Sequence, residues 1–533
     1  MHSGHLRVLA FAVFCGAVAG QVPAWAQAPV ARVNPAIKQI VDQVSEERIS
    51  ATMKKLGDFG TRYVLSEQDS DTRGIGAAQR WIEAQFKSYS PKLQVSLDKF
   101  TVKKNQRPAK DVDLANVVAV LPGTTDKDRY VVIGGHYDSI AARRGPGTPR
   151  TDDEGPRSAA DVEPNAPGVA DDASGTAAVM ELARIMSQYD FDKSIVFIAF
   201  AAEEIGLNGS KNYADEAKAK NMMIEAMLNN DIIGSDVAGN GSSANSRVRL
   251  FSEGPEDSPS RALARYAKET AERYLPSMTV DMIFRRDRFS RGGDHTSFVQ
   301  DGFAAVRFTT PSENFANQHT ATDTFANASP SYTTRVARVN AAVLASLALA
   351  PKPPMVTPPR GQGGFGGQGG GGGRGGRGAN PAAGSPPGGS PGTPAAPAAA
   401  LTPEEQQQRR TAAANRPGLS RGKSGYDAAL RWANPNPEPD LAGYAVVIRD
   451  TTSPVWQREI YVGNVTEYTI PDFSIDDVVI GVKAIDKDGN QSLVSVYEQG
   501  GTTTPQRPAD GAGGAAGSAG GGPTGGPGGG RQQ

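Results

Sequence analysis

Cysteine is nearly absent from this sequence of 533 residues. The single cysteine, Cys15, lies close to the amino end. One cysteine excludes a disulfide framework, and it also excludes a metal site built from several thiolates. Any metal ion held by this chain must therefore be bound through nitrogen and oxygen ligands.

An excess of either charge is also lacking. The chain has 56 basic and 57 acidic side chains, which gives a formal net charge of −1. This balance argues against a general nucleic-acid binder, so we expect no nucleic-acid partner. Beyond Ala26, no apolar run reaches the ~20 residues needed to cross a bilayer, and we expect no membrane span.

The amino end has the features of a secretory signal peptide. Residues 1–7 are basic, residues 8–19 are apolar, and Ala24 and Ala26 offer small side chains at the positions that a signal peptidase reads. The apolar run is about half of the ~20 residues that a membrane anchor needs. We therefore predict a signal peptide over residues 1–26, cleavage near Ala26, and a protein that is secreted or periplasmic.

The distribution of glycine divides the rest of the chain. Many of the 62 glycines lie in two tracts, 361–378 and 511–530, and proline and alanine are frequent in the residues that follow the first tract. Such composition is typical of linkers and disordered tails. It predicts a linker over 351–424 and a disordered tail over 501–533, which leaves two globular regions, 27–350 and 425–500.

The first globular region alternates strand-like and helix-like segments. Short apolar runs predict strands, and helical spacing of apolar residues predicts helices. We expect strands at 131–134, 194–202, 223–233, 247–251 and 304–308, and helices at 174–189, 259–274 and 332–350. Alternation of this kind predicts an α/β fold with a doubly wound, mostly parallel sheet and helices on both faces. Ligands of such sheets bind beyond the carboxyl ends of the strands.

The second globular region has short segments with alternating apolar residues and turn signals between them. This pattern predicts a small all-β sandwich. The segments L-R-W, P-D-L-A-G-Y, T-E-Y-T and V-K-A-I-D-K-D-G-N-Q-S resemble a fibronectin type III module. We expect this module to serve attachment or spacing, through contact with a cell surface or a polysaccharide.

Histidine is scarce, which makes the three histidines outside the signal peptide informative: His136, His295 and His319. His136 comes directly after the predicted strand 131–134, where side chains point into the ligand cleft. Asp138, two residues further on, is placed to accept the second N–H of the His136 ring. His295 follows Asp294, and His319 begins the segment H-T-A-T-D-T.

Carboxylates occur at matching places along the α/β region. Asp171 and Asp172 open a predicted helix, for which an N-cap is the simpler interpretation of that motif alone. Glu203 and Glu204 close a buried strand, and Asp231 lies near the end of the next one. Together with the histidines they form a nitrogen and oxygen ligand set that suits zinc, with cobalt or manganese as substitutes.

Paired metal ions would activate water for hydrolysis, and a further carboxylate would have to carry the proton to the leaving group. The doublet of Glu203 and Glu204 offers such a spare carboxylate. No G-x-S-x-G nucleophile motif competes with this interpretation, and neither a P-loop nor a G-x-G-x-x-G follows a strand.

The ordered motifs H-Y-D-S, D-D-A-S-G, A-E-E-x-G-x-x-G-S, N-D-I-I-G, G-D-H-T-S-F and H-T-A-T-D-T resemble the co-catalytic di-zinc aminopeptidase family. That family also contains glutamate carboxypeptidases and glutaminyl cyclases. The resemblance covers residues 34–350 and implies a peptide substrate and two zinc ions. It further implies ligands for one zinc from His136 and Asp231, and for the other from Glu204 and His319.

The same resemblance assigns the remaining residues. Asp171 would bridge both ions and be followed by a cis peptide bond, and Glu203 would be the general base and then the acid. Asp138 would support His136. The resemblance gives Asp172, Asp294 and His295 roles in support or substrate positioning. One departure is Gln318, which stands where some relatives place a tyrosine that polarises the substrate carbonyl.

Several functions remain open at this point. An exported zinc aminopeptidase is the leading hypothesis. A glutamate-type carboxypeptidase would be favoured if the arginines at 285, 286, 288 and 291 faced the cleft, because they would bind a substrate carboxylate. Glutaminyl cyclase is disfavoured, since that branch tends to lose the second aspartate, which is present here as Asp172. The non-enzymatic alternative is a surface or adhesion protein with a vestigial peptidase domain.

Overall fold

The structure, a computed structural model, describes residues 33–104, 108–142, 164–289, 291–357, 416–434 and 437–497. The predicted signal peptide, the predicted tail and most of the predicted linker lie outside these residues. Within the described ranges, no helix is long and apolar enough to cross a membrane.

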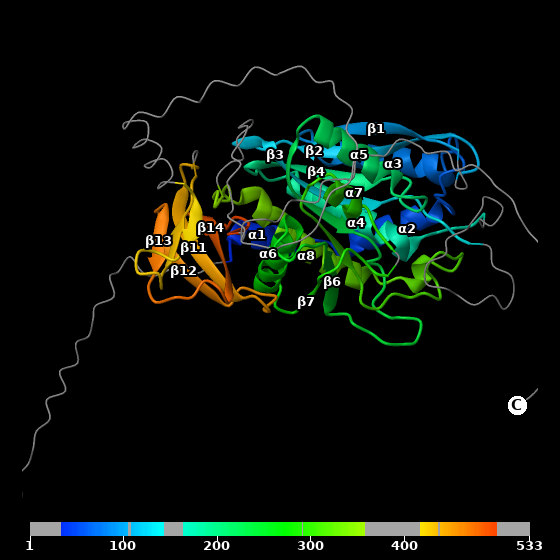
Figure 1. Cartoon of the computed structure of the whole chain (residues 1–533). Coiled ribbons are helices and arrows are strands. Elements are labelled where there is room, and N and C mark those ends of the chain that lie inside the picture. Colours follow the sequence, from blue (N-terminus) through cyan, green and yellow to red (C-terminus); the bar gives the residue numbers. More distant parts are fainter. Residues whose placement is uncertain are drawn as a thin grey trace, which may run out of the picture. The chain divides into compact units, whose positions relative to one another are not determined.

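An eight-stranded sheet forms the centre of the α/β domain, with the strand order β1-β2-β4-β3-β5-β8-β6-β7 (Figure 1). Its strands are β1 (Gln94–Val102), β2 (Val112–Leu121), β3 (Asp126–His136), β4 (Lys193–Phe200), β5 (Met223–Asn230), β6 (Arg247–Ser252), β7 (Thr279–Ile283) and β8 (Ala305–Thr309). The central strands β4, β3, β5 and β8 run parallel to one another, and so do β6 and β7. The pairs β1–β2, β2–β4 and β6–β8 are antiparallel.

Helices cover both faces of this sheet (Figure 1). They are α1 (Pro35–Asp42), α2 (Glu46–Asp58), α3 (Gly74–Tyr89), α4 (Ser174–Met186), α5 (Asn208–Ala219), α6 (Pro259–Tyr274), α7 (His295–Gln300) and α8 (Pro330–Leu349). Two short turns of helix add to them, the π-type turn η3 (Val169–Ala173) and the 3-10 turn η4 (Phe325–Asn327).

Strand β4 shows why the domain needs two layers of helices. All eight of its residues are buried, and the six apolar ones, residues 195–200, alternate between two separate hydrophobic cores. Ile195 and Phe197 pack in the core that contains α4 and α8, whereas Val196 and Ile198 pack in a second core with Ala214 of α5. A strand that is covered on both faces has a continuous run of apolar residues in its sequence. The predicted α/β class with helices on both faces is confirmed.

The last described residues form two antiparallel sheets. One contains β9 (Gly418–Ser420), β10 (Ala428–Arg431) and β13 (Glu467–Ile470), and the other contains β11 (Leu441–Asp450), β12 (Arg458–Gly463), β14 (Val478–Asp486) and β15 (Ser495–Val496). Leu430 from the first sheet and Val446 from the second belong to one shared hydrophobic core. These sheets make the predicted sandwich, whereas its assignment as a fibronectin type III module stays a prediction.

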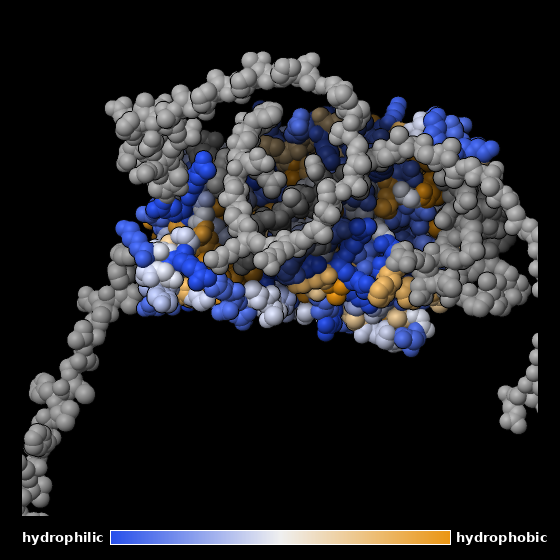
Figure 2. Space-filling model, in the orientation of Figure 1, coloured by the Kyte–Doolittle hydropathy of each residue, from blue (hydrophilic) through white to orange (hydrophobic). Residues whose placement is uncertain are grey.

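Apolar side chains are scattered over the face of the molecule that Figure 2 shows. Figure 2 shows hydrophilic residues interspersed with small hydrophobic patches on the visible face. Large exposed apolar side chains, such as Met223, Phe289 and Tyr426, come from segments far apart in the sequence. Scattered exposed apolar residues of this kind are normal for a protein surface.

Candidate metal centre

Three neighbouring strands bring polar side chains to the same edge of the sheet. His136 is the last residue of β3, Glu203 and Glu204 follow β4 closely, and Asp231 comes directly after β5. Strand β3 pairs in parallel with both β4 and β5, so the three carboxyl ends lie side by side. This is the place where a sheet of this class is expected to bind its ligand.

Asp171 reaches the same place from the turn η3, ahead of helix α4. The peptide bond between Asp171 and Asp172 is cis. The Asp172 carboxylate accepts the backbone N–H groups of His136 at 3.2 Å, Gly175 at 2.9 Å and Ile232 at 3.2 Å. Asp172 therefore caps the first turn of α4 and also ties three segments of the site together.

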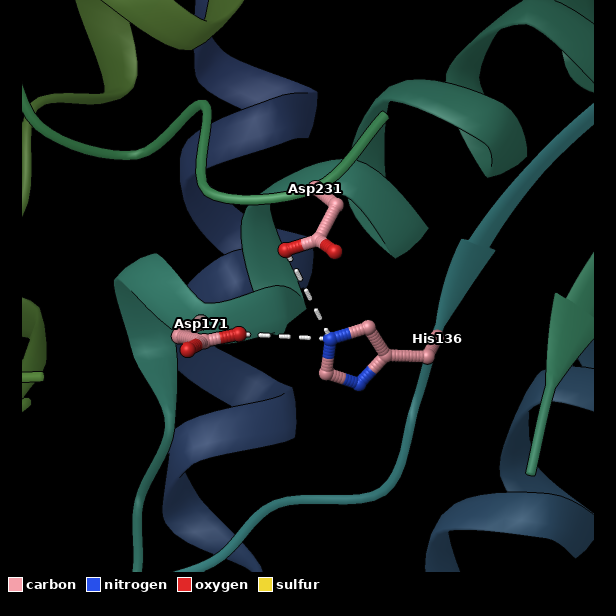
Figure 3. Close-up of side chains that lie close together, drawn as sticks. All are labelled: His136, Asp171 and Asp231. Carbon is pink, nitrogen blue, oxygen red and sulfur yellow. Dashed lines mark ion pairs between the residues drawn. The ribbon is translucent and has the colours of Figure 1, made fainter. Parts of the chain in front are cut away.

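The first cluster contains His136, Asp171 and Asp231 (Figure 3). The Nε2 atom of His136 lies 3.2 Å from Asp171 Oδ1 and 3.8 Å from Asp231 Oδ1. The three side chains come from β3, from η3 and from the end of β5, and each is nearly or fully buried.

The second cluster contains Asp171, Glu204 and His319. His319 Nε2 lies 3.1 Å from Asp171 Oδ2 and 3.1 Å from Glu204 Oε2. In both clusters one ligand atom from each residue lies within 4.8 Å of the others. Asp171 turns one carboxylate oxygen toward each cluster, which is the geometry of a bridging ligand.

These donor sets fit zinc. Each cluster offers an imidazole nitrogen with carboxylate oxygens, which is a common set of protein ligands for this ion. Glu204 Oε1 is buried and has no hydrogen-bond partner among the described residues. Burial alone would lower the pKa of His319, but the charges of Glu204 and Asp171 and their hydrogen bonds raise it to about 10. A cation at this position would relieve the same excess of negative charge.

Glu203 stands beside the first cluster and is not part of it. Its Oε2 atom lies 4.0 Å from His136 Nε2, and its side chain is 13% exposed. Burial raises the pKa of Glu203 well above its ordinary value, with further raising by Asp231 and Glu204, while the charge of His136 opposes this. A carboxyl group with a raised pKa is suited to proton transfer near neutral pH.

Asp138 contacts the His136 ring and also holds the backbone of both glutamates. His136 Nδ1 lies 3.1 Å from the backbone carbonyl oxygen of Asp138 and 3.5 Å from its carboxylate. The carboxylate instead accepts the backbone N–H groups of Glu203 at 3.1 Å and Glu204 at 3.2 Å. Asp138 thus fixes the positions of both glutamates relative to His136.

Comparison with known proteins identifies the family. The pattern described as peptidase family M28 matches residues 116–344. A protein of Pyrenophora tritici-repentis named as a probable zinc metalloprotease is 31% identical over 492 residues, which cover 86% of this chain and 96% of that protein. A probable zinc metalloprotease of Pyricularia oryzae is 33% identical over 502 residues, which cover 88% of this chain and 84% of that protein. The chain belongs to peptidase family M28. It is a metallopeptidase.

Solved structures of similar proteins include the LapA aminopeptidase of Legionella pneumophila, with 20% identity, a TM-score of 0.45, and coverage of 60% of this chain and 76% of that chain. An aminopeptidase from Aneurinibacillus sp. strain AM-1 has 18% identity and a TM-score of 0.44, and covers 59% and 96% respectively.

Arg62 is a residue of this metallopeptidase that the sequence did not reveal. It is fully buried, and its guanidinium group donates to the carbonyl oxygens of Leu56, Tyr137, Pro167 and Gly168. Tyr137 follows His136, and Gly168 precedes the turn that carries Asp171. Arg62 therefore holds two ligand-bearing loops together, although no motif in its surroundings indicates this role.

Asp323 holds the bridging residue by its backbone. Its two carboxylate oxygens accept the N–H groups of Ala170 at 2.8 Å and Asp171 at 3.0 Å, and its carbonyl oxygen accepts that of Val169 at 3.1 Å. Burial raises the pKa of Asp323 to about 7. Asp323 lies in the motif H-T-A-T-D-T, which pointed to His319 but gave no role to this residue.

Two further side chains contact the ligands directly. Arg307 Nη2 lies 3.1 Å from Asp231 Oδ1, and its side chain is fully buried in strand β8. An arginine inside a buried apolar strand is itself a signal, because such a charge needs partners. Gln318 Nε2 donates to Asp171 Oδ2 at 3.0 Å, so this departure from the family pattern lies within reach of both clusters.

The structure brings Asp294 and His295 near the site but not into either cluster. Both are fully buried at the start of α7. His295 Nε2 lies 2.9 Å from the carbonyl oxygen of Arg286, and burial lowers the pKa of His295. Burial also raises the pKa of Asp294 to about 7. A supporting role for both residues is compatible with these positions.

Three of the four arginines near residue 288 pair with carboxylates of the chain itself. Arg286 pairs with Glu253, and both Arg288 and Arg291 pair with Glu313. Arg285 lies over the ring of Phe289, 3.9 Å from its centroid. A carboxypeptidase was favoured only if these arginines were available to bind a substrate carboxylate. Their contacts within the chain argue against that role.

Proposed function

We propose that this metallopeptidase is an exported aminopeptidase that uses two zinc ions and removes single residues from the amino end of peptides. The observation that carries the proposal is the sharing of Asp171 between the two clusters, with Glu203 next to them. His136 and Asp231 would hold one ion, Glu204 and His319 the other, and Asp171 both. Cobalt or manganese would be the substitutes.

Zinc, when bound, supplies Lewis acidity and lowers the pKa of a coordinated water molecule. The chain supplies the remaining steps. Glu203 takes the proton from the attacking water and gives it to the nitrogen of the leaving amine, which requires a carboxyl group whose pKa is near the working pH. Asp138 keeps Glu203 in reach by holding its backbone N–H.

Selection of the amino end follows from the charges around the clusters. A free substrate ammonium group would be attracted by the carboxylate of Glu203, which lies beside the first cluster. A substrate carboxylate would have to compete with Glu253 for Arg286 and with Glu313 for Arg288 and Arg291. The glutamate-type carboxypeptidase is therefore the weaker proposal.

The proposal includes the location of the protein. Cleavage near Ala26 would release a secreted or periplasmic enzyme, because residues 1–26 have the features of a signal peptide. The C-terminal sandwich would be a fibronectin type III module that contacts a cell surface or a polysaccharide.

The variant Glu203→Gln tests the proposed catalysis. It keeps the size of the side chain and removes the proton-accepting group, so kcat on a tripeptide with a free amino end should fall by at least about 100-fold. Zinc content, measured by mass spectrometry of the metal, should stay at two ions per chain. Glu216→Gln is the control, because Glu216 pairs with Lys220 on the surface. Unchanged kcat in the Glu203 variant would overturn its assignment as the base.

A further inference from the structure

We infer that the C-terminal sandwich, defined as residues 416–434 and 437–497, is a fixed part of the peptidase body and not a module on a long tether. The surface that receives it is the amino end of helix α6 with the loop before it. The inference does not depend on the proposed aminopeptidase activity.

The path of the chain gives the first argument. Helix α8 ends at Leu349, and Met355 already pairs with Ala433 of the sandwich through two backbone hydrogen bonds of 2.7 and 2.8 Å. Val356 is buried in the sandwich core. The described residues on both sides of the glycine-rich segment 358–415 therefore belong to the sandwich, because β9 follows at Gly418–Ser420. Only the residues from 350 to 354 separate α8 from the sandwich.

A charged contact gives the second argument. Arg449 of β11 is fully buried, and its Nη2 atom lies 2.5 Å from Asp257 Oδ1 and 3.6 Å from Glu256 Oε1. From the other side, Arg265 of α6 donates through Nε to the carbonyl oxygen of Pro454 at 3.0 Å. Its own side chain is 1% exposed and also pairs with Glu256. One buried arginine of the sandwich thus contacts the α/β domain, and one buried arginine of the α/β domain contacts the sandwich.

Arg449 is held ready for this contact. Its Nη1 atom donates to the carbonyl oxygens of Asp450 at 3.2 Å, at the end of β11, and of Thr451 at 3.4 Å and Ser453 at 3.0 Å in the loop that follows. The guanidinium group therefore has a fixed orientation, which lowers the entropy lost when it meets Asp257. Arg449 is fully buried whereas the side chain of Asp257 is 29% exposed, so removal of Asp257 would leave a buried guanidinium charge without this partner, which is destabilising.

Further contacts, both apolar and polar, connect the sandwich and its connecting residues with the α/β domain. Leu493 of the sandwich is buried in the core of the α/β domain and not in the sandwich core. Asn34, the N-cap of α1, donates through Nδ2 to Asn490 Oδ1 at 3.3 Å. Lys352 Nζ lies 3.4 Å from Asp126 of β3 and 3.9 Å from Glu438 of the sandwich. These contacts come from separate parts of the chain, so they oppose rotation of the sandwich.

A cut within the glycine-rich segment tests the inference. A protease recognition sequence is inserted between residues 358 and 415 of the full chain, and complete cleavage is verified on a denaturing gel. A second version produces the two fragments together from a gene split at the same point. A docked sandwich predicts that both fragments elute as one species in size-exclusion chromatography. Separate elution of the fragments at micromolar concentration would overturn the inference.

Two variants of the cleavable chain identify the contact. Arg449→Ala removes the sandwich partner of the ion pair, and Asp257→Ala removes its partner in the α/β domain. Each should weaken association of the fragments by at least about 100-fold. The exchange Asp257→Arg with Arg449→Asp should restore part of that association. Arg421→Ala is the control, because Arg421 pairs with Asp476 inside the sandwich and is exposed. Equal association of all variants would contradict the role of Arg449.

Discussion

Asp323 acts on the candidate metal centre through the backbone of another residue. Its carboxylate holds the N–H groups of Ala170 and Asp171, so it fixes the direction of the peptide that carries the bridging carboxylate. Such supporting groups commonly change metal affinity by 10-fold to 100-fold when they are altered. Asp323 is therefore a positioning residue of the site and not one of its ligands.

We expect Asp323→Asn to weaken zinc binding by roughly 10-fold to 100-fold, because one of its two acceptor oxygens becomes a donor that faces a backbone N–H. Competition with a zinc chelator measures this affinity. With zinc in excess, kcat should stay within about threefold of the parent, since no proton-transfer group has changed. Asp58→Asn, at an exposed pair with Lys54, is the control. An unchanged zinc affinity would contradict the role of Asp323 as a positioning residue.

The pKa of His319 predicts how zinc and pH together affect stability. The pKa is raised from 6.5 to about 10 in the metal-free fold. A raised folded pKa stabilises the chain fully below pH 6.5, and this contribution is lost as pH rises to about 10. Zinc binds the neutral imidazole, so its binding must release that proton and becomes more favourable as pH rises toward 10. The difference in Tm between zinc-saturated and metal-free protein should therefore increase from pH 6.5 to pH 10. A constant or falling difference would contradict the prediction.

Sequence position indicated four residues of the two clusters, because His136, Glu204 and Asp231 follow strands and Asp171 precedes a helix. His319 and the division of these residues into two ligand sets came from the resemblance of the motifs to a known family. The sequence did not predict Arg62 or Arg307. Arg62 acts through bonds to backbone carbonyl groups that are brought together only by the fold. Arg307 pairs with Asp231 and Asp287 across three separate segments, which a single sequence cannot connect.

At the scale of elements, the approach of helix α4 to strand β5 depends on Gly175. A Cβ atom at this position would lie 2.3 Å from Asp172 Oδ2 and 2.4 Å from the carbonyl oxygen of Asn230. Neither atom can move freely, because Asp172 holds three backbone N–H groups and Asn230 ends β5, next to Asp231. The packing of the helix and the position of two site residues are thus connected.

We expect Gly175→Ala to lower the free energy of unfolding by about 1–3 kcal/mol, as overpacking in a core usually does. Zinc affinity should fall as well, because Asp172 and Asp231 must shift. Chemical denaturation and chelator competition measure the two effects. Gly418→Ala, where nothing lies within 4 Å of the added atom, should change stability by less than about 0.5 kcal/mol. A stable Gly175 variant with normal zinc affinity would show that the helix adapts.

Elements with strong signals were predicted closely. Helix α6 has the predicted bounds, and β4 was recognised by its continuous apolar run. Strands β1, β2 and β7 were not predicted. Strands β1 and β7 lie at edges of the sheet and expose part of their residues, so they lack the long apolar run of a buried strand. Strand β2 lies between β1 and β4 and is largely buried, so its position in the sheet does not explain why it was not predicted.

At the scale of the whole molecule, the α/β domain positions the two clusters and the sandwich packs against it. The sequence predicted the two globular regions from composition and periodicity. It did not predict the contact between Arg449 and Asp257, because these residues lie 192 positions apart. A glycine-rich segment between two regions is usually interpreted as a spacer. Here its described neighbours on both sides, Val356 and Gly418–Ser420, belong to the sandwich.

The central claim is that this metallopeptidase removes residues from the amino end. The most direct measurement incubates the zinc-loaded protein with matched peptides that have free or acetylated amino ends and free or amidated carboxyl ends, and follows the products by mass. The account predicts loss of single residues from free amino ends, whether or not the carboxyl end is amidated. Loss of residues from carboxyl ends, loss of ammonia from peptides that begin with glutamine, or no change in any peptide would contradict it.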